Sequence, residues 1–313
     1  MTTFGLQLPN FGFGVPDDQL FDQVAARAAA AEGAGFRSLW VMDHLYQLPA
    51  LGGADQPMLE AYTLLGALAA RTETATLGTM VTGVTYRNPA LLAKIVTTLD
   101  VISKGRAVLG LGAAWHDLEH TGYGFDFPPV GERMDRLEEA LQICRAMFER
   151  DHVSFDGAHY RTDDARNLPR PVQAGGPEIL VGGGGERRTL RLVAQYADAC
   201  NLHGDPDGIR HKLDVLHRHC ADVGRDPAEI RVTRLATLVI TTSAQQTGEL
   251  QNFLARAAGP DALTTSNLGQ PGEVVEQIQA LADAGVQEFV FNMPLADPAA
   301  IEAAGELFQS AFA

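Results

Sequence analysis

Cysteine is scarce in this sequence and shows no paired spacing. The 313 residues include three cysteines, Cys144, Cys200 and Cys220, and no Cys-x-x-Cys motif. An odd number of separated thiols argues against a disulfide scaffold and against a zinc knuckle. The composition fits a protein of the reducing cytoplasm, and we expect that location.

Positive charge and long apolar runs are also lacking. Lys and Arg number 24 against 39 Asp and Glu, which gives a formal net charge of -15. A field of that sign repels nucleic acid and anionic membrane surfaces, so neither is expected as a partner. No window reaches the roughly 18 apolar residues that a membrane helix needs, and the first residues lack the pattern of an export signal. We therefore expect a protein that is neither membrane-embedded nor exported.

A regular alternation of short apolar runs with alanine- and leucine-rich segments fills the chain. It predicts repeated βα units around a parallel sheet. The predicted strands lie at residues 4–8, 38–42, 75–81, 107–111, 179–181, 199–202, 231–240 and 288–292. Eight such pairs suit a (β/α)8 TIM barrel, in which a single domain of this length is normal. We predict one domain over residues 1–313.

Two stretches interrupt the alternation, at residues 113–130 after the fourth strand and 152–177 before the fifth. The second contains Phe155, Gly157 and Tyr160, which suggest a hairpin. Loops of this length in a compact domain are usually lids, binding loops or insertions. We expect both on the catalytic rim of the barrel.

The pair Asp43-His44 directly follows the predicted strand at residues 38–42. In TIM barrels the reacting groups lie at the carboxyl ends of strands and in the loops after them. A histidine there can exchange a proton near neutral pH, and a carboxylate beside it biases its tautomer and charge. We predict that His44 is catalytic and that Asp43 assists it; the alternative is a loop histidine that caps the next helix.

Four consecutive glycines lie between the fifth predicted strand and a helix, and two arginines follow them, at Arg187 and Arg188. Bare N–H groups at a helix start form an anion site, and guanidinium groups add charge to it. The alternative is a tight turn with solvated arginines. The spacing is not that of a P-loop, because no Gly-Lys-Ser/Thr follows.

Small residues also end the fourth strand, at Gly112 and Ala113 before Trp115. They let a planar ligand approach the backbone, although close packing of a strand on a helix would favour the same composition. The next five residues, from His116 to His120, match the H-x-x-E-H zinc signature. They lie in a loop bounded by glycine and proline with no further carboxylate ligand, so no metal site is expected.

Three longer stretches together resemble one known family. They are GFRSLWVMDHL, the stretch from LGTMVTGVTYRNP to GERMDRLEEALQI, and ILVGGGGERRTLRLVAQYADACN. They resemble the bacterial luciferase-like superfamily, and specifically its F420-dependent branch. The similarity covers residues 1–235 closely and the remainder loosely.

This resemblance implies a (β/α)8 barrel with insertions that holds a flavin or deazaflavin ring at the carboxyl ends of the strands. It implies that Asp43 and His44 line the ring, and that a non-prolyl cis peptide at Met80-Val81 backs it. The glycine loop would receive the cofactor's phosphate, and Arg187 and Arg188 its anionic tail. The cofactor-binding residues expected in this way are Met80, Val81, Thr82, Gly112, Ala113, Trp115, Glu119, Val181, Gly182, Gly183, Gly184, Gly185, Arg187 and Arg188.

Two departures separate this chain from the sugar-phosphate dehydrogenases of the branch. Trp115 stands where they have a catalytic glutamate, and Asn201 and His203 occupy the region where they have a lysine. A phosphorylated sugar is therefore not expected as the substrate. Trp115 and Tyr46 favour an apolar or aromatic binding face instead.

The activity that the resemblance implies is hydride transfer between C5 of coenzyme F420 and a small organic substrate, for which the cofactor supplies the redox chemistry. An FMN-dependent monooxygenase of the same fold is the alternative, because fold similarity does not fix the cofactor. A non-catalytic barrel subunit is an alternative from another class. Dimers are common in the family, so we expect a homodimer.

Overall fold

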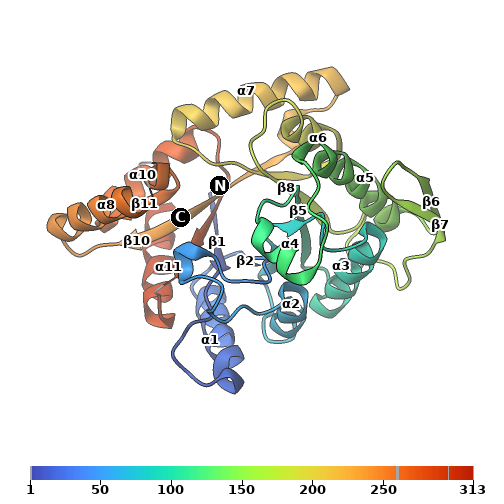
Figure 1. Ribbon diagram of the computed structural model, residues 1–313. Helices are drawn as coiled ribbons and strands as arrows, with labels where there is room; N and C mark the ends of the chain where they lie inside the picture. The colour runs from blue at the N-terminus through green and yellow to red at the C-terminus, as the bar shows by residue number, and fades with distance from the viewer. Residues whose placement is uncertain (1, 259–260, 295, 313) are drawn as a thin grey trace.

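A closed ring of eight parallel strands forms the centre of the computed structural model, which describes residues 2–258, 261–294 and 296–312. Neighbouring strands pair in parallel around the ring, and the last strand pairs with the first (Figure 1). In order, the strands are β1 (Thr3–Leu8), β2 (Ser38–Val41), β3 (Thr76–Thr79), β5 (Ala107–Gly112), β8 (Glu178–Gly182), β9 (Ala199–Asn201), β10 (Arg231–Ile240) and β12 (Glu288–Asn292). The predicted barrel and its eight strands are confirmed.

Helices follow the strands and surround the ring (Figure 1). They are α1 (Leu20–Gly33), α2 (Ala61–Ala69), α3 (Pro89–Ser103), α4 (Asp117–Tyr123), α5 (Val130–Glu149), α6 (Thr189–Tyr196), α7 (Pro206–Val223), α8 (Ala244–Ala258), α9 (Asp261–Thr264), α10 (Pro271–Asp283) and α11 (Pro298–Phe312). The short 3-10 helices are η1 (Asp17–Gln19), η2 (Pro49–Leu51) and η3 (Pro227–Glu229). None of the described helices is long and apolar enough to span a membrane.

Local sequence explains where these elements start. The side chain of Asn88 accepts a hydrogen bond from the amide of Ala90 at 2.9 Å, and Pro89 occupies the first turn of α3. Proline is tolerated there because its missing N–H would have had no partner within the helix. In β5 every residue is buried, as expected for a strand covered on both faces.

The barrel is closed at the end where its strands begin. The indole of Trp40 lies inside, and its Nε1 donates a hydrogen bond to Ser38 Oγ at 2.7 Å. Ser38 in turn donates to Glu288, which also pairs with Arg231. These three polar residues are the first residues of β2, β12 and β10. Because they fill the amino end, the carboxyl end is the one left for a ligand.

The two interruptions are confirmed as insertions, but only the first lies at the rim. It carries α4, whereas the second forms a hairpin of β6 (Val153–Asp156) and β7 (Arg161–Ala165). The hairpin packs along α5, where Glu139 accepts hydrogen bonds from the amides of Ala158 and Tyr160 at 2.7 and 2.9 Å. The prediction that the hairpin lies on the rim was wrong, because α5 first returns the chain toward the opposite end.

Two short strands were not predicted. The strand β4 (Thr82–Gly83) follows β3 after a break and pairs with β5. The strand β11 (Ser266–Gly269) pairs with the second half of β10, outside the closed ring. Both are too short to give a periodic apolar pattern.

Candidate active site

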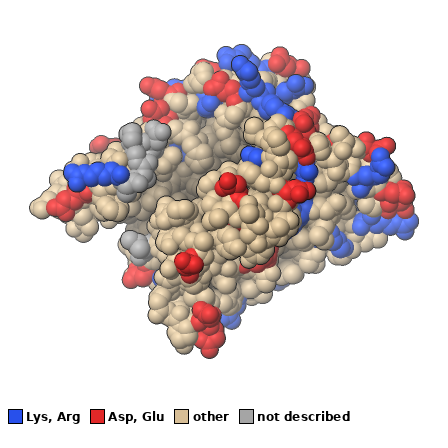
Figure 2. All heavy atoms as spheres, viewed as in Figure 1, with Lys and Arg blue, Asp and Glu red and all other residues tan. Residues whose placement is uncertain are grey.

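A cavity of about 720 Å³ lies at the carboxyl end of the barrel. Seen from the side shown in Figure 1, the surface is hollowed beside the α4 segment, and most of the charged residues lie around the edge (Figure 2). Every barrel strand supplies lining near its end: Gln7, Met42, Met80, Gly112, Gly182, Asn201, Leu235 and Asn292. This is where a TIM barrel carries its chemistry.

The cavity brings together most of the residues expected from the sequence. Those that line it are Asp43, His44, Met80, Val81, Thr82, Gly112, Ala113, Trp115, Gly182 and Gly183. Those that do not line it are Glu119, Val181, Gly184, Gly185, Arg187 and Arg188. Val181 packs instead in the buried core between the strands and the helices.

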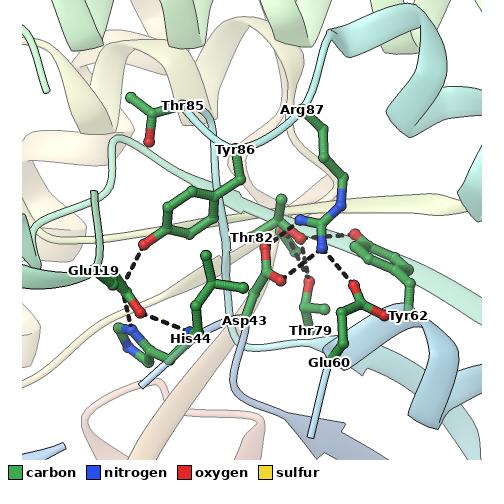
Figure 3. Close-up of polar contacts among 12 residues, drawn as sticks. Asp43, His44, Glu60, Tyr62, Thr79, Thr82, Thr85, Tyr86, Arg87 and Glu119 are labelled. Carbon is green, nitrogen blue, oxygen red and sulfur yellow. Dashed lines mark hydrogen bonds and ion pairs between the residues drawn. The ribbon is translucent and has the colours of Figure 1, made fainter. Parts of the chain in front are cut away.

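The imidazole of His44 is held by a buried carboxylate. Its Nδ1 lies 2.7 Å from Oε1 of Glu119, whose side chain is 0% exposed (Figure 3). Burial alone would raise the pKa of Glu119, but hydrogen bonds from two side chains and one backbone amide lower it to about 2. Glu119 therefore lies behind His44 as an anion, which corrects the expectation that it borders the cofactor.

Asp43 faces a different partner from the one expected. Its two carboxylate oxygens accept hydrogen bonds from Arg87 at 2.7 and 3.0 Å, and Arg87 also binds Glu60 at 2.6 Å (Figure 3). Burial raises the pKa of Asp43, and the charge of Arg87 opposes that shift. The carboxylate of Asp43 thus contacts Arg87, and the carboxylate that contacts the His44 ring directly is Glu119.

The peptide bond between Met80 and Val81 is cis, as the resemblance implied. The buried amide of Gln7 donates to the carbonyl oxygen of Met80 at 3.3 Å. On the far side of the bond, Thr82 Oγ1 lies 2.7 Å from the hydroxyl of Tyr62 and 2.8 Å from that of Thr79. Side chains on both sides thus hold this part of the cavity wall in place.

Glycines give the backbone room around the same segment. A Cβ added at Gly110 would lie 1.9 Å from the carbonyl oxygen of Thr79, and one at Gly112 or Gly182 would lie 2.8 or 2.9 Å from the side chain of Val81. Contacts this short force the backbone or Val81 to move. The small residues at the end of β5 are therefore required by close approach at the cavity wall.

Replacing Gly110 with alanine is expected to lower the free energy of unfolding by about 1–3 kcal/mol, because the new methyl group meets backbone rather than a flexible side chain. Urea denaturation followed by circular dichroism measures the change. Gly66→Ala in α2 is the matched control, since a Cβ there has nothing within 4 Å and is expected to stabilise the helix slightly. Equal stabilities for the two variants would contradict the close approach.

The first glycines of the loop line the cavity, whereas the two arginines that follow the loop do not. Gly182 and Gly183 line the cavity, and Gly183 has a φ of 113° that favours glycine. Arg188 instead pairs with Asp135 of α5 at 2.6 Å, and Arg187 lines a separate surface hollow beside α7. The expectation that these two arginines face the cofactor site is corrected, because both side chains are directed to the outer helices.

Several polar lining residues were not anticipated as site residues, among them Tyr86, Thr189, Asn201 and His203. Desolvation by the surrounding protein and the charge of nearby Arg234 both lower the pKa of His203. It follows β9 by two residues, so its position after a strand was the available signal. A neutral imidazole at this point offers the cavity hydrogen bonding without charge.

Two residues of the zinc signature, Glu119 and His120, have protein partners for their side chains, whereas Nε2 of His116 is buried with no hydrogen-bond partner among the described residues. His120 contacts Thr85 through Nε2 at 2.6 Å and the carbonyl of His116 through Nδ1 at 2.7 Å. Glu119 is bound to His44, as described above. Across the described residues, no group of three or more potential ligands lies close enough to hold a metal ion.

Comparison with known proteins adds a sequence match and a fold match. A family model described as luciferase-like monooxygenase matches residues 2–259. The F420-dependent glucose-6-phosphate dehydrogenase of Nocardia farcinica is 31% identical over 299 residues, which cover 85% of this chain and 86% of the relative.

Two solved structures share the whole fold. An F420-dependent secondary alcohol dehydrogenase, solved with an F420-acetone adduct, superposes with a TM-score of 0.82 at 20% identity and covers 100% of this chain and 99% of its own. A monooxygenase from Streptomyces bottropensis superposes with a TM-score of 0.80 at 20% identity. The match covers 99% of this chain and 98% of the monooxygenase. At these identities the two structures establish the architecture and leave the cofactor open.

Proposed function

Since this chain belongs to the luciferase-like monooxygenase family, we propose that it is an F420-dependent oxidoreductase that transfers a hydride between C5 of the deazaflavin and a small organic substrate. The observation that carries this proposal is the cavity of about 720 Å³ at the ends of all the barrel strands, with His44 on its wall. The name of the Nocardia farcinica relative supports the choice of cofactor.

The residues present fit a flat ring with a phosphate attached. Met80 and Val81 give an apolar wall, and the glycines beside Val81 leave bare backbone where any Cβ would collide. Gly183 and Thr189 lie on the cavity wall just before and at the start of α6, where the amino end of a helix favours a phosphate; the amide of Gly183 itself donates to the carbonyl oxygen of Asn201 at 3.3 Å. When bound, F420 supplies the hydride chemistry at C5. His44 then exchanges the accompanying proton with the substrate.

We propose a substrate without a phosphate group. Among the described residues that line the cavity, none is lysine or arginine. Asn201 and the neutral His203 provide hydrogen bonds rather than a cation. Such a wall suits an uncharged compound with a C=O, C–OH, C=N or C=C group.

Titration of the purified protein with F420 and with FMN, followed by fluorescence, tests the cofactor. We expect saturable binding of F420 and weak binding of FMN, because the resemblance is to the F420-dependent branch. The reduced enzyme with F420 should consume no oxygen, since reduced F420, unlike reduced FMN, reacts poorly with O2. FMN that stays bound through purification, together with no binding of F420, would overturn the proposal.

The second candidate is an FMN-dependent monooxygenase, since a monooxygenase from Streptomyces bottropensis shares the fold. Oxygen uptake with reduced FMN and no turnover with F420 would select it. A non-catalytic subunit is the third candidate, and any cofactor-dependent turnover excludes it. We also propose that residues 1–313 act as one domain in a cytoplasmic homodimer; the three cysteines are all free and buried.

A further inference from the structure

Glu119 accepts three hydrogen bonds and also contacts a ring nitrogen of His44. Its Oε2 accepts from the backbone amides of Leu45 at 2.6 Å and Tyr46 at 3.3 Å. Its Oε1 accepts from the hydroxyl of Tyr86 and lies 2.7 Å from Nδ1 of His44 (Figure 3). Backbone amides can only donate, so one oxygen of this side chain must be an acceptor for both of them.

We propose that Glu119 is a positioning residue that fixes His44 in the tautomer with its hydrogen on Nδ1, so that Nε2 is the proton acceptor for the cavity. An ionised carboxylate has no hydrogen to donate. The low pKa of Glu119, about 2, keeps its carboxylate ionised at neutral pH. The ring nitrogen that faces it must therefore carry the hydrogen.

This arrangement has a direct consequence for proton transfer. A neutral imidazole with Nδ1–H has one lone pair for a proton, on Nε2. As the O–H bond of a substrate breaks, an N–H bond forms at Nε2, and the imidazolium that results lies beside an anion that stabilises it. The same proton returns from Nε2 in the reverse reaction. The inference rests on the proposed function, because the substrate must enter the cavity that His44 lines.

Among the described residues, no other neighbour of His44 offers the same contact. Asp43 is bound to Arg87, and Tyr86 reaches His44 only through Glu119. The rings of Trp115 and His116 meet the His44 ring edge-on, with centroids 5.6 and 5.8 Å away. Glu119 is thus the carboxylate that contacts His44 directly.

The variant Glu119→Gln tests this assignment, because an amide cannot satisfy the same four donors. Its oxygen must face the two backbone amides, which places its NH2 group against Tyr86 and Nδ1 of His44. Nδ1 then becomes the acceptor, and the hydrogen moves to Nε2. We expect kcat/KM to fall about 10- to 100-fold at neutral pH, because Nε2 then carries the hydrogen and cannot accept the proton of the substrate.

Nitrogen-15 NMR of histidine-labelled, cofactor-free protein gives a readout that does not depend on activity. The wild type is expected to show His44 with Nδ1–H, and Glu119→Gln to show Nε2–H; loss of the signal in His44→Ala assigns it. Glu139→Gln is the matched control, since Glu139 also accepts backbone amides but lies on α5, away from the cavity. It should leave both the tautomer of His44 and kcat/KM unchanged.

A wild-type protein with Nε2–H on His44 would overturn the proposal, whether or not the glutamine variant folds. An unchanged tautomer of His44 in Glu119→Gln would overturn it as well. If the protein does not bind F420 but NMR shows the hydrogen of His44 on Nδ1, the proposed function is refuted and the role of Glu119 stays intact. The two failures are therefore distinguishable.

Discussion

Turnover of His44→Ala with F420 is expected to fall by about 10²-fold or more, since general acid-base catalysis typically contributes that much. His44 lines the cavity, and its ring is held by Glu119 rather than by the backbone. Alanine removes the proton acceptor and leaves the cavity wall formed by Met80 and Val81 unchanged. Steady-state kcat, followed by the absorbance of F420, should therefore fall while the dissociation constant of F420 changes little.

His152→Ala is the control for this measurement. His152 also has Nδ1 against a carboxylate, at 2.5 Å from Asp164, but it lies on the exposed hairpin, with its side chain 56% exposed. Its replacement should leave kcat unchanged. If His44→Ala also turned over at the wild-type rate, His44 would be removed from the mechanism and the pair with Glu119 would be structural.

The barrel could be predicted because parallel strands covered on both faces give continuous apolar runs. β5 shows this directly, with every residue buried. The strand β11 could not be predicted, because its four residues include serine, asparagine and glycine and it pairs outside the ring. The hairpin does not line the cavity because it packs along α5, and the sequence does not show which face of that helix it covers.

The position of His44 could be predicted from its place after a strand, but its partner could not. Asp43 is adjacent in the chain, yet successive residues leaving a strand point in different directions, and Asp43 turns to Arg87. Glu119 lies 75 residues away in the sequence and meets His44 only because neighbouring strands place their loops together. Asn201 and His203 were noticed only as departures from relatives, because single polar residues after a strand form no motif.

Arg87→Met is expected to lower the free energy of unfolding of the cofactor-free protein by about 3–5 kcal/mol. Arg87 binds both oxygens of Asp43, a residue only 3% exposed. Methionine keeps an apolar stem beside the ring of Tyr62 but leaves the Asp43 carboxylate buried without its cation. Urea denaturation at neutral pH measures the loss.

The loss should depend on pH in a defined direction. Burial already raises the pKa of Asp43, and without Arg87 that rise must be larger. A carboxyl group with a raised folded-state pKa destabilises the fold above that pKa, and protonation relieves the penalty as pH falls. The difference in free energy of unfolding between the wild type and Arg87→Met should therefore become smaller from about pH 7 to about pH 5. The free energy of unfolding of the wild type should change less over this range.

Two further variants separate the buried charge from lost packing. Combining Arg87→Met with Asp43→Asn removes both charges and should recover much of the lost stability, because no ion is left buried. Glu60 is the second partner of Arg87, and the side chain of Glu60 is 42% exposed. Glu60→Gln should change the free energy of unfolding by less than about 1 kcal/mol, because solvent screens that ion pair. Arg87 would act through packing alone if two results were found together: the loss of unfolding free energy in Arg87→Met is equal at both pH values, and Asp43→Asn does not reduce it.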